Sequence, residues 1–595
     1  MSGEEGRGDE YTQDGTTDLK GNPILRSERG RWKACSFIIV YDVFERMAFY
    51  GISSNLVIYM TRELHKGTVA SSNSVTNWVG TTWLIPILGA YVADAHLGRY
   101  WTFLISSAIY LLGMGLLTLA VSLSSLKPPP CNQIDVTNCK KASTSQMAVV
   151  FLALYVLAVG TGGTKPNIST IGADQFDDFD PKEKALKLSF FNWWIFGIYL
   201  GTLIGSTFLV YVQDNVGWAL GYGIPTIGLA VSMIIFMVGT PSYRHRAPTG
   251  SPFTRMARVI VFALWKWRVS IPSDPSQLYE LDHKEYEAKG KFRIEHTASL
   301  RFFDKAAVQT SSDSPWKLCP VTQVEETKQM LRMIPIMVTT FVPSIMFAQS
   351  ITLFVQQGVT LDRHLGNFRI PPASLNGFIT ISMLISIVIY DQVFVKVIRK
   401  WTKNPRGVTL LQRMGVGLAL YVVVMLAAFL TERRRLRVAR DHGLVENGGV
   451  LPLSILTLLP QFVLMGVADA FLAIATTEFF YDQAPENMKS LGSSYTMTSL
   501  GVGNFLSTFV LTTVSHATKK NGHRGWILNN LNASHLDYYY AFFTVFNFLN
   551  FILFLVVSRF YVYRAEVSDS MQVLEKKLRM SSRKATVTNR EELGR

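Results

Sequence analysis

The chain has 595 residues, of which 48% are hydrophobic and only 17% are charged, and its formal net charge is +15 at pH 7. A soluble protein of this length would carry more charge, whereas apolar runs of about 20 residues, each long enough to cross a bilayer, recur along this sequence. We therefore predict an all-α, multi-pass membrane protein. Basic residues that collect in cytosolic loops account for the positive charge, so we expect no nucleic-acid partner.

Residues 1–35 begin with a polar, glycine-rich stretch and are expected to form a disordered cytosolic tail. Six apolar segments form a predicted N-terminal bundle, residues 36–240, and six more form a C-terminal bundle, residues 329–563. A cytosolic linker (241–328) joins the bundles, and a cytosolic tail (564–595) ends the chain. Two six-helix halves joined by a long cytosolic loop are typical of the major facilitator fold. The twelve predicted spans are 36–60, 75–97, 101–123, 146–172, 188–212, 218–240, 329–357, 371–398, 407–430, 451–480, 490–517 and 538–563.

Basic residues are enriched in cytosolic loops, and their distribution places the N-terminus on the cytosolic side. The arginine-rich stretch TERRRLRVAR (431–440) is an exception, because this topology places it outside. The outer loops hold Cys131 and Cys139, which form a disulfide or remain two thiols. They also hold Asn532 in NAS, a candidate glycosylation site. No cysteine pair has histidines at zinc-ligand spacing, so we expect no metal. In the linker, residues 253–269 alternate basic and apolar side chains, which predicts an amphipathic helix on the membrane face or a solvated linker helix.

The first span contains three ionisable side chains, Asp42, Glu45 and Arg46, which share one face of a helix. A charge in mid-bilayer costs at least about 2.5 kcal/mol on insertion scales, so these residues need a partner or a function. One acid can pair with Arg46, while burial beside a like charge favours the protonated form of the other. The cluster therefore predicts a proton-coupling site; the alternative is a static ion pair that fixes helix packing.

The loop between spans 2 and 3 reads GAYVADAHLGRY, which is similar to the short-loop signature of the major facilitator superfamily. Its acid and its arginine, Asp94 and Arg99, are expected to act in gating by latching the cytosolic side.

Two further charges lie at matching places in the two halves, Lys165 in span 4 and Glu478 in span 10. Pseudo-symmetry predicts that they face each other across a central cavity, pair when the cavity is empty, and hold opposite ends of a charged substrate. The glycines at 160, 162 and 163 are expected to loosen the helix beside Lys165. Arg413, near the cytosolic start of span 9, is explained by snorkelling to the surface.

These motifs resemble the proton-dependent oligopeptide transporter family, and within it the plant peptide/nitrate transporter branch. The matching segments are DxxER at 42–46, GTGGTKPNISTIGADQFD at 160–177, FFNWWIFGIYLG at 190–201 and EFFYDQAPENMKS at 478–490. The resemblance implies that Glu45 and Arg46 couple protons and that Lys165 and Glu478 contact substrate or gate. The peptide-carrying members that it most resembles are those induced in plant stress and defence.

The resemblance also suggests three further candidate functional residues. Tyr50 falls at an aromatic cavity position, Asn376 at a peptide-contact position, and Thr102 at a phosphorylatable threonine of a nitrate-carrying relative. Packing, for Tyr50, and helix capping, for Thr102, are the plainer alternatives.

Several positions depart from the family pattern. Asp42 replaces a glutamate, Ser53 replaces a second arginine, and Tyr199 replaces an asparagine. Phe347 stands where bacterial members have an acid and the nitrate-carrying relative has a histidine. Part of the bacterial peptide clamp is therefore missing, and so is the nitrate-associated histidine.

We predict a proton-coupled symporter of small solutes, above all di- and tripeptides, that works by alternating access. It is not expected to be an enzyme or to need a cofactor other than protons. Its partners are the lipid membrane and a small-molecule substrate, its location is the plasma membrane ahead of the vacuolar membrane, and its oligomeric state stays open. One alternative is proton-coupled transport of nitrate or an organic anion. A second alternative is a ligand sensor without bulk transport.

Overall fold

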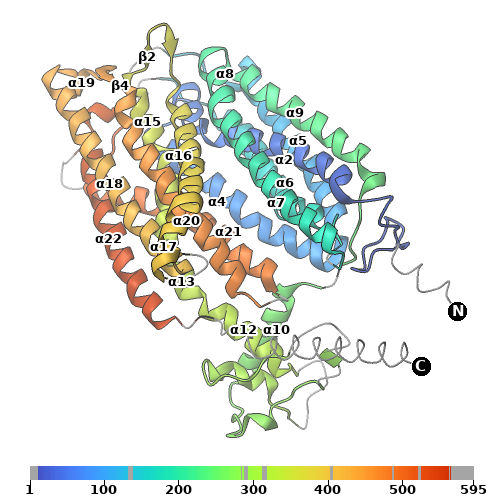
Figure 1. Ribbon diagram of the computed structural model, residues 1–595. Coiled ribbons are helices and arrows are strands. Elements are labelled where there is room, and N and C mark those ends of the chain that lie inside the picture. The colour runs from blue at the N-terminus through green and yellow to red at the C-terminus, as the bar shows by residue number, and fades with distance from the viewer. Residues whose placement is uncertain are drawn as a thin grey trace, which may run out of the picture.

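The computed structural model describes residues 11–131, 139–177, 179–248, 250–282, 285–286, 293–310, 318–402, 407–485, 488–519, 524–561 and 563. The predicted C-terminal tail, residues 564–595, lies outside the described residues. Long helices form two side-by-side bundles, and the linker lies below them at the end where α2 begins and α22 ends (Figure 1). We call that end the inner end, and the opposite end the outer end.

The N-terminal bundle contains six long helices and two short segments at its outer end. They are α2 (Arg31–Ser53), α3 (Leu56–Ile58), α4 (Thr68–Val92), α5 (Arg99–Ser122), α6 (Thr144–Ala173), α7 (Pro181–Ile204), α8 (Val210–Asn215) and α9 (Trp218–Val238).

The C-terminal bundle begins with one bent span and continues with five further spans. The bent span consists of α12 (Val321–Arg332), α13 (Ile334–Thr339), α14 (Phe341–Ser350) and α15 (Leu353–Val359). The others are α16 (Asn376–Ile389) with its continuation α17 (Val395–Thr402), α18 (Leu410–Asp441), α20 (Leu459–Gln483), α21 (Lys489–Thr518) and α22 (Leu536–Phe560). Outer loops carry α19 (Leu444–Asn447), β1 (Leu361–Asp362) parallel to β4 (Leu451–Ser454), and β2 (His364–Leu365) antiparallel to β3 (Phe368–Arg369).

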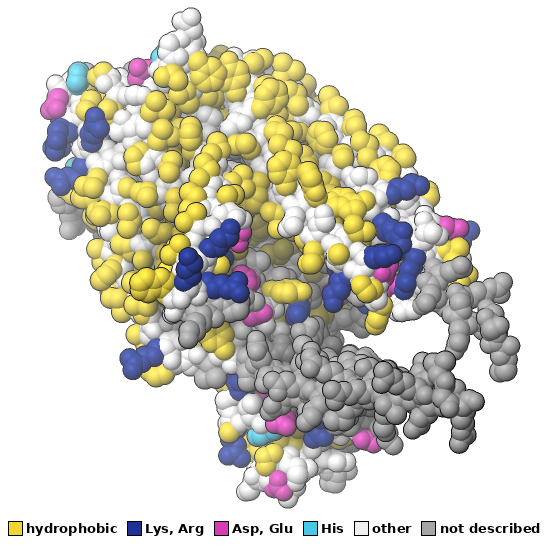
Figure 2. All heavy atoms as spheres, in the orientation of Figure 1, with side chains coloured by type: hydrophobic (Ala, Val, Ile, Leu, Met, Phe, Trp, Pro, Cys, Tyr) yellow, Lys and Arg dark blue, Asp and Glu magenta, His cyan; other side chains and the backbone are white. Residues whose placement is uncertain are grey.

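Within the described residues, nine helices are long and apolar enough to span a bilayer, and the bent span, with its 44° break, makes a tenth. Together with the helices α2 and α4, these make up the twelve predicted membrane spans. Both are long, but α2 carries the charged cluster and the first half of α4 is rich in serine, threonine and asparagine. Apolar side chains cover the flanks of both bundles, while lysine and arginine gather toward the two ends (Figure 2). This is the surface expected of a protein surrounded by lipid.

Small residues allow α6 to approach its neighbours closely. A Cβ atom on Gly160 would lie 2.5 Å from the backbone of Tyr110 in α5, and one on Gly163 would lie 2.1 Å from the Ser106 hydroxyl. The helix itself is continuous through this region. The expectation that these glycines loosen the helix is therefore wrong, because they serve tight packing between helices instead.

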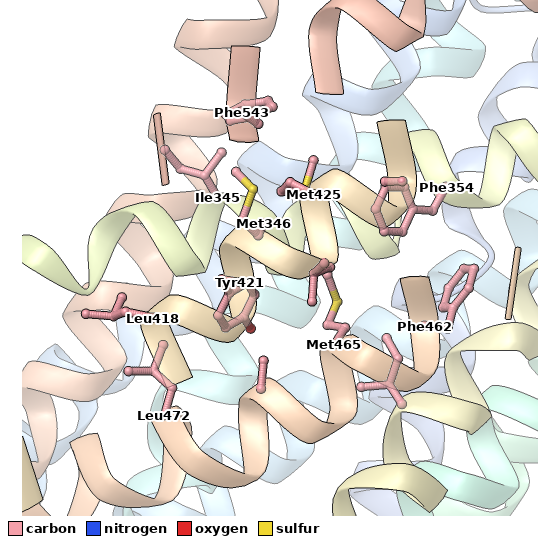
Figure 3. Close-up of a cluster of buried hydrophobic side chains, with 14 of the residues drawn as sticks. Ile345, Met346, Phe354, Leu418, Tyr421, Met425, Phe462, Met465, Leu472 and Phe543 are labelled. Carbon is pink, nitrogen blue, oxygen red and sulfur yellow. The ribbon is translucent and has the colours of Figure 1, made fainter. Parts of the chain in front are cut away.

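The apolar core of the C-terminal bundle joins α14, α15, α18, α20 and α22. Figure 3 shows Met346, Met425 and Met465 in this core, together with aromatic residues such as Phe354 and Phe462. Flexible methionine side chains suit an irregular contact between crossing helices.

Residues 11–30 correct the expectation of a disordered tail, since they make specific contacts under the N-terminal bundle. The backbone N–H of Gln13 and the Arg26 guanidinium both donate to Asp177, each at 2.9 Å. Thr17 forms a β-bridge with His245, after α9. The chain beyond Tyr11 is thus held against the loop between α6 and α7.

The predicted amphipathic helix of the linker exists as α10 (Pro252–Trp265). Arg255 pairs with Glu326 of α12 at 2.9 Å, so part of its basic face packs against the linker itself. The opposite face exposes Val261, Leu264 and Trp265.

The helix α18 continues past the predicted end at residue 430 to Asp441, which gives the arginine-rich stretch a structural explanation. Arg435 is fully buried and donates all five N–H groups: two to Glu432, and the others to Thr360, Asn532 and the Leu531 carbonyl. Arg435 therefore ties the outer loops to α18.

Asn532 is held by the same network. Its side-chain oxygen accepts from Arg435, and its amide nitrogen donates to the carbonyls of Leu444 and Gly449 at 3.2 and 3.1 Å. Only 3% of the residue is exposed, so the folded chain has no room for the glycan predicted from the NAS motif.

The two outer cysteines, which the sequence left as a disulfide or two thiols, are bonded. Cys131 and Cys139 form a disulfide in the loop between α5 and α6. A disulfide agrees with the placement of this end outside the cytosol.

We predict that Arg435→Ala lowers the free energy of unfolding by about 3–5 kcal/mol, because it leaves the buried Glu432 carboxylate unpaired. Thermal unfolding of the purified protein in detergent measures this loss. The matched control is Arg434→Ala, at the neighbouring exposed position, which should change the midpoint little. Equal effects of the two variants would contradict the assigned role of Arg435.

Candidate functional site

The charged cluster in α2 forms as the helical spacing predicts. The Arg46 Nε atom lies 3.6 Å from Asp42 Oδ1 and 3.3 Å from Glu45 Oε2, and all three side chains are buried. Neither Glu45 oxygen has a hydrogen-bond partner. The loose geometry means that the arginine is shared between two acids and satisfies neither fully.

Lys165 lies against the same cluster. Its Nζ atom is 3.7 Å from the centre of the Phe49 ring and 4.5 Å from that of Trp83, and it has no hydrogen-bond partner. Its electrostatic neighbours are Glu45, Arg46 and Asp42. Two aromatic faces therefore stabilise a buried ammonium group beside the proton-coupling candidates.

The predicted pairing of Lys165 with Glu478 is not found. Glu478 lies near the inner end of α20, where it interacts electrostatically with Tyr390 and Arg413. Lys165 therefore interacts within the N-terminal bundle and Glu478 within the C-terminal bundle.

Arg413 also differs from its expected role, since it does not snorkel. Its guanidinium donates to the Ala470 carbonyl of α20 at 2.9 Å and lies 4.1 Å from the centre of the Tyr390 ring. It therefore joins α18 to α20 inside the bundle.

An acid that sequence reasoning missed, Asp469, lies in the middle of α20. It accepts a hydrogen bond from the Tyr421 hydroxyl at 2.5 Å, and it interacts electrostatically with Tyr50 and Tyr199 of the N-terminal bundle. Asp469 is thus a carboxylate of the C-terminal bundle that interacts with the opposite half. A signal was available, because Asp469 in GVADAFLA is an acid in the middle of an apolar span.

Tyr50 and Tyr199 lie where the two bundles meet. The ring of Tyr50 packs edge-on against Phe49 at 5.3 Å, which places it beside the Lys165 pocket. The Tyr199 hydroxyl contacts the Met383 sulfur of α16 at 3.7 Å. The position that carries asparagine in bacterial relatives therefore provides a contact between the halves here.

Asn376, the peptide-contact candidate, begins α16 about two turns outward of Met383. Its amide donates to the Ala373 carbonyl at 3.1 Å and it is largely buried. This hydrogen bond stabilises the turn that precedes α16.

The gating candidates form an ion-pair cluster at the inner end of the N-terminal bundle. Arg99 lies 3.7 Å from Asp94 and 2.5 Å from Asp174, at the end of α6. Gly98 has φ +77°, a conformation that favours glycine, and it allows the sharp turn between α4 and α5. All three charged residues belong to one bundle, so the cluster clamps α4, α5 and α6 together.

Thr102 lies one turn into α5. Its hydroxyl donates to the Gly98 carbonyl at 2.8 Å, and it is 5% exposed. A kinase would need this turn to open before it reached the hydroxyl.

One group of possible metal ligands occurs among the described residues, in the linker: His296, Asp304 and Glu325. The Lys328 ammonium lies 2.6 Å from Asp304 and 2.8 Å from Glu325. This lysine supplies the positive charge that a metal ion would bring.

Comparison with known proteins identifies a family and similar relatives. The sequence matches the family described as "PTR2: POT family" over residues 100–527. Protein NRT1/ PTR FAMILY 5.2 of Arabidopsis thaliana is 66% identical over 570 residues, which cover 96% of this chain and 98% of that relative.

Two solved structures share the fold. The crystal structure of an auto-inhibited POT family peptide transporter matches with a TM-score of 0.65 and 20% identity, covering 90% of this chain and 98% of that one. A POT family transporter in complex with a thioalcohol-conjugated peptide matches with a TM-score of 0.59 and 14% identity, covering 93% and 99%. The predicted major facilitator fold is therefore confirmed. From its family match and its identity to relatives across nearly the whole sequence, this chain belongs to the POT family of proton-dependent oligopeptide transporters.

Proposed function

We propose that this protein is a proton-coupled symporter that carries di- and tripeptides across the plasma membrane by alternating access. Membership of a transporter family supports transport rather than catalysis. The observation that carries the proposal is the juxtaposition of an unpaired buried lysine with two acids that share one arginine. A structural neighbour with a bound peptide conjugate also supports a peptide cargo.

The charge balance of the α2–α6 cluster links a proton to an anion. When both acids are ionised, the two negative charges of Asp42 and Glu45 balance the two positive charges of Arg46 and Lys165. One proton on either acid leaves an excess positive charge in a site of low dielectric constant, which is costly. A substrate carboxylate that binds Lys165 removes this excess, so proton and substrate bind together.

The opposite end of a peptide is proposed to bind Asp469. Lys165 lies on Phe49, and Asp469 lies within electrostatic reach of Tyr50, the next residue. An extended dipeptide spans about 7 Å. The peptide would bind Lys165 through its carboxylate and Asp469 through its amine, so both bundles would contact one substrate. Asp469 thereby takes the role that the sequence assigned to Glu478.

Contacts between the two bundles support a state that is closed at the outer end. At the outer end, the Thr68 N–H donates to Asn529 at 3.0 Å and Asn73 donates to Thr512 at 2.8 Å, joining the α4 end to α21 and the following loop. Alternating access requires these contacts to break while those at the inner end form. Asp94 and Arg99 are proposed to keep the inner ends of α4 and α5 rigid as the bundles rock.

An anion such as nitrate or an organic acid remains the second candidate cargo, since Lys165 by itself provides an anion site. Asp469 argues for a substrate that also carries an amine.

We predict that Glu45→Gln abolishes uptake driven by an inward pH gradient while leaving substrate exchange at equal pH partly intact, because a neutral side chain cannot bind and release the proton. Radiolabelled dipeptide uptake into cells, with and without the gradient, measures both activities. Uptake by the variant that still follows the gradient would disprove the coupling role.

We predict that Asp469→Asn raises the KM for dipeptides at least about ten-fold, since a charge-assisted hydrogen bond is lost. Glu478→Gln, in the same helix but beside Arg413, should affect KM much less. Dipeptide uptake as a function of concentration compares the two variants. The reverse order would return the substrate role to Glu478.

We predict that unlabelled di- and tripeptides, but not nitrate, compete with labelled dipeptide. A neutral dipeptide should also evoke an inward current at acid external pH, because the proton carries the charge. Competition by nitrate at similar concentration would favour the anion alternative, and saturable binding without current would favour a sensor.

A further inference from the structure

A second charged cluster joins the two bundles at the outer end. Asp214 of α8 accepts a hydrogen bond from Arg363 at 2.7 Å, and Arg363 lies between β1 and β2 of the opposite bundle. The other Asp214 oxygen lies 3.7 Å from Arg62, at the outer end of the first span. The Asp214 and Arg363 side chains are only 6% and 5% exposed, so water screens this contact poorly. Figure 1 places α8 and β2 at the same end.

A third arginine gives this cluster an excess of positive charge. Arg369 of β3 is exposed and lies close enough to act electrostatically on both Arg62 and Arg363. Burial, and after it the charges of Arg62 and Arg369, lower the pKa of Arg363. The acids in reach are Asp214 and Glu63.

Opening of the outer side must separate these groups. Arg363 and Arg369 move with the C-terminal bundle, whereas Asp214 and Arg62 move with the N-terminal bundle. Arg363 then loses its carboxylate. A guanidinium that has lost its partner in a poorly hydrated place is destabilised, and a carboxylate from outside restores the pairing.

We propose that Arg363 and Arg369, with Arg62 facing them, form an outer subsite that captures the carboxylate of an incoming peptide. Asp214 occupies this subsite as an internal ligand when the outer side is closed. The subsite is separate from the Lys165 site, and its role as a capture site for cargo depends on the peptide-transport function proposed above. Cargo with a second carboxylate, such as an acidic dipeptide, gains most from it.

The transport test uses Arg369→Gln, because this residue is exposed and its replacement leaves the fold intact. We expect the KM for Ala-Glu to rise about five-fold, which corresponds to about 1 kcal/mol, while that for Ala-Gln changes less than about two-fold. Arg434→Gln, an exposed arginine at the same end, is the matched control and should change neither. Equal changes for both dipeptides, or no change for Ala-Glu, would overturn the proposal.

A binding test does not depend on transport. Asp214→Asn removes the internal carboxylate, so 10 mM Ala-Glu should raise the thermal unfolding midpoint of this purified variant more than Ala-Gln does. Adding Arg369→Gln to it should abolish the difference. Failure of the peptide-transport function would leave this result unchanged, whereas equal shifts with both dipeptides would overturn the subsite. An equal shift with acetate would show a site for any carboxylate and overturn the assignment to peptide.

Discussion

The arrangement of the site depends on one constraint, the cost of leaving a charge uncompensated among hydrocarbon. Asp42, Glu45, Arg46 and Lys165 lie together where lipid surrounds the bundle, and they are stable there only as a group. Their contacts are imperfect: the arginine is shared, and the lysine lies on aromatic rings rather than on a carboxylate. A site that is nearly but not fully satisfied can exchange partners at low cost, and transport requires such exchange.

The rest of the N-terminal bundle is built to hold this group in place. Glycines of α6 permit contact with α5 at backbone distance, so Lys165 is positioned by rigid neighbours. The Arg99 cluster fixes the inner ends of α4, α5 and α6. The bundle can therefore move as a body, and the charges inside it respond to ligands rather than to helix flexing.

The C-terminal bundle uses its buried charges differently. Arg435 with Glu432 is fully satisfied and ties outer loops to α18, whereas Asp469 has one tyrosine partner and faces the opposite half. The number of partners thus separates structural from functional charges: a saturated pair holds the fold, and an under-satisfied acid is ready for a ligand. By the same reasoning, Asp214 and Arg363, which join opposite bundles, belong to the moving parts.

The sequence alone determined the features that follow from local geometry. Hydrophobic length predicted the twelve spans, and helical periodicity predicted that Asp42, Glu45 and Arg46 meet, because neighbours on one helix face are fixed by the turn itself. Motif resemblance predicted the family. Only the tertiary structure decided which distant charges face each other: Lys165 meets the first span instead of Glu478, Asp469 takes the central place in α20, and residues 11–30 dock under the bundle. These outcomes depend on helix depth and rotation, which packing between chain segments sets and no local pattern encodes.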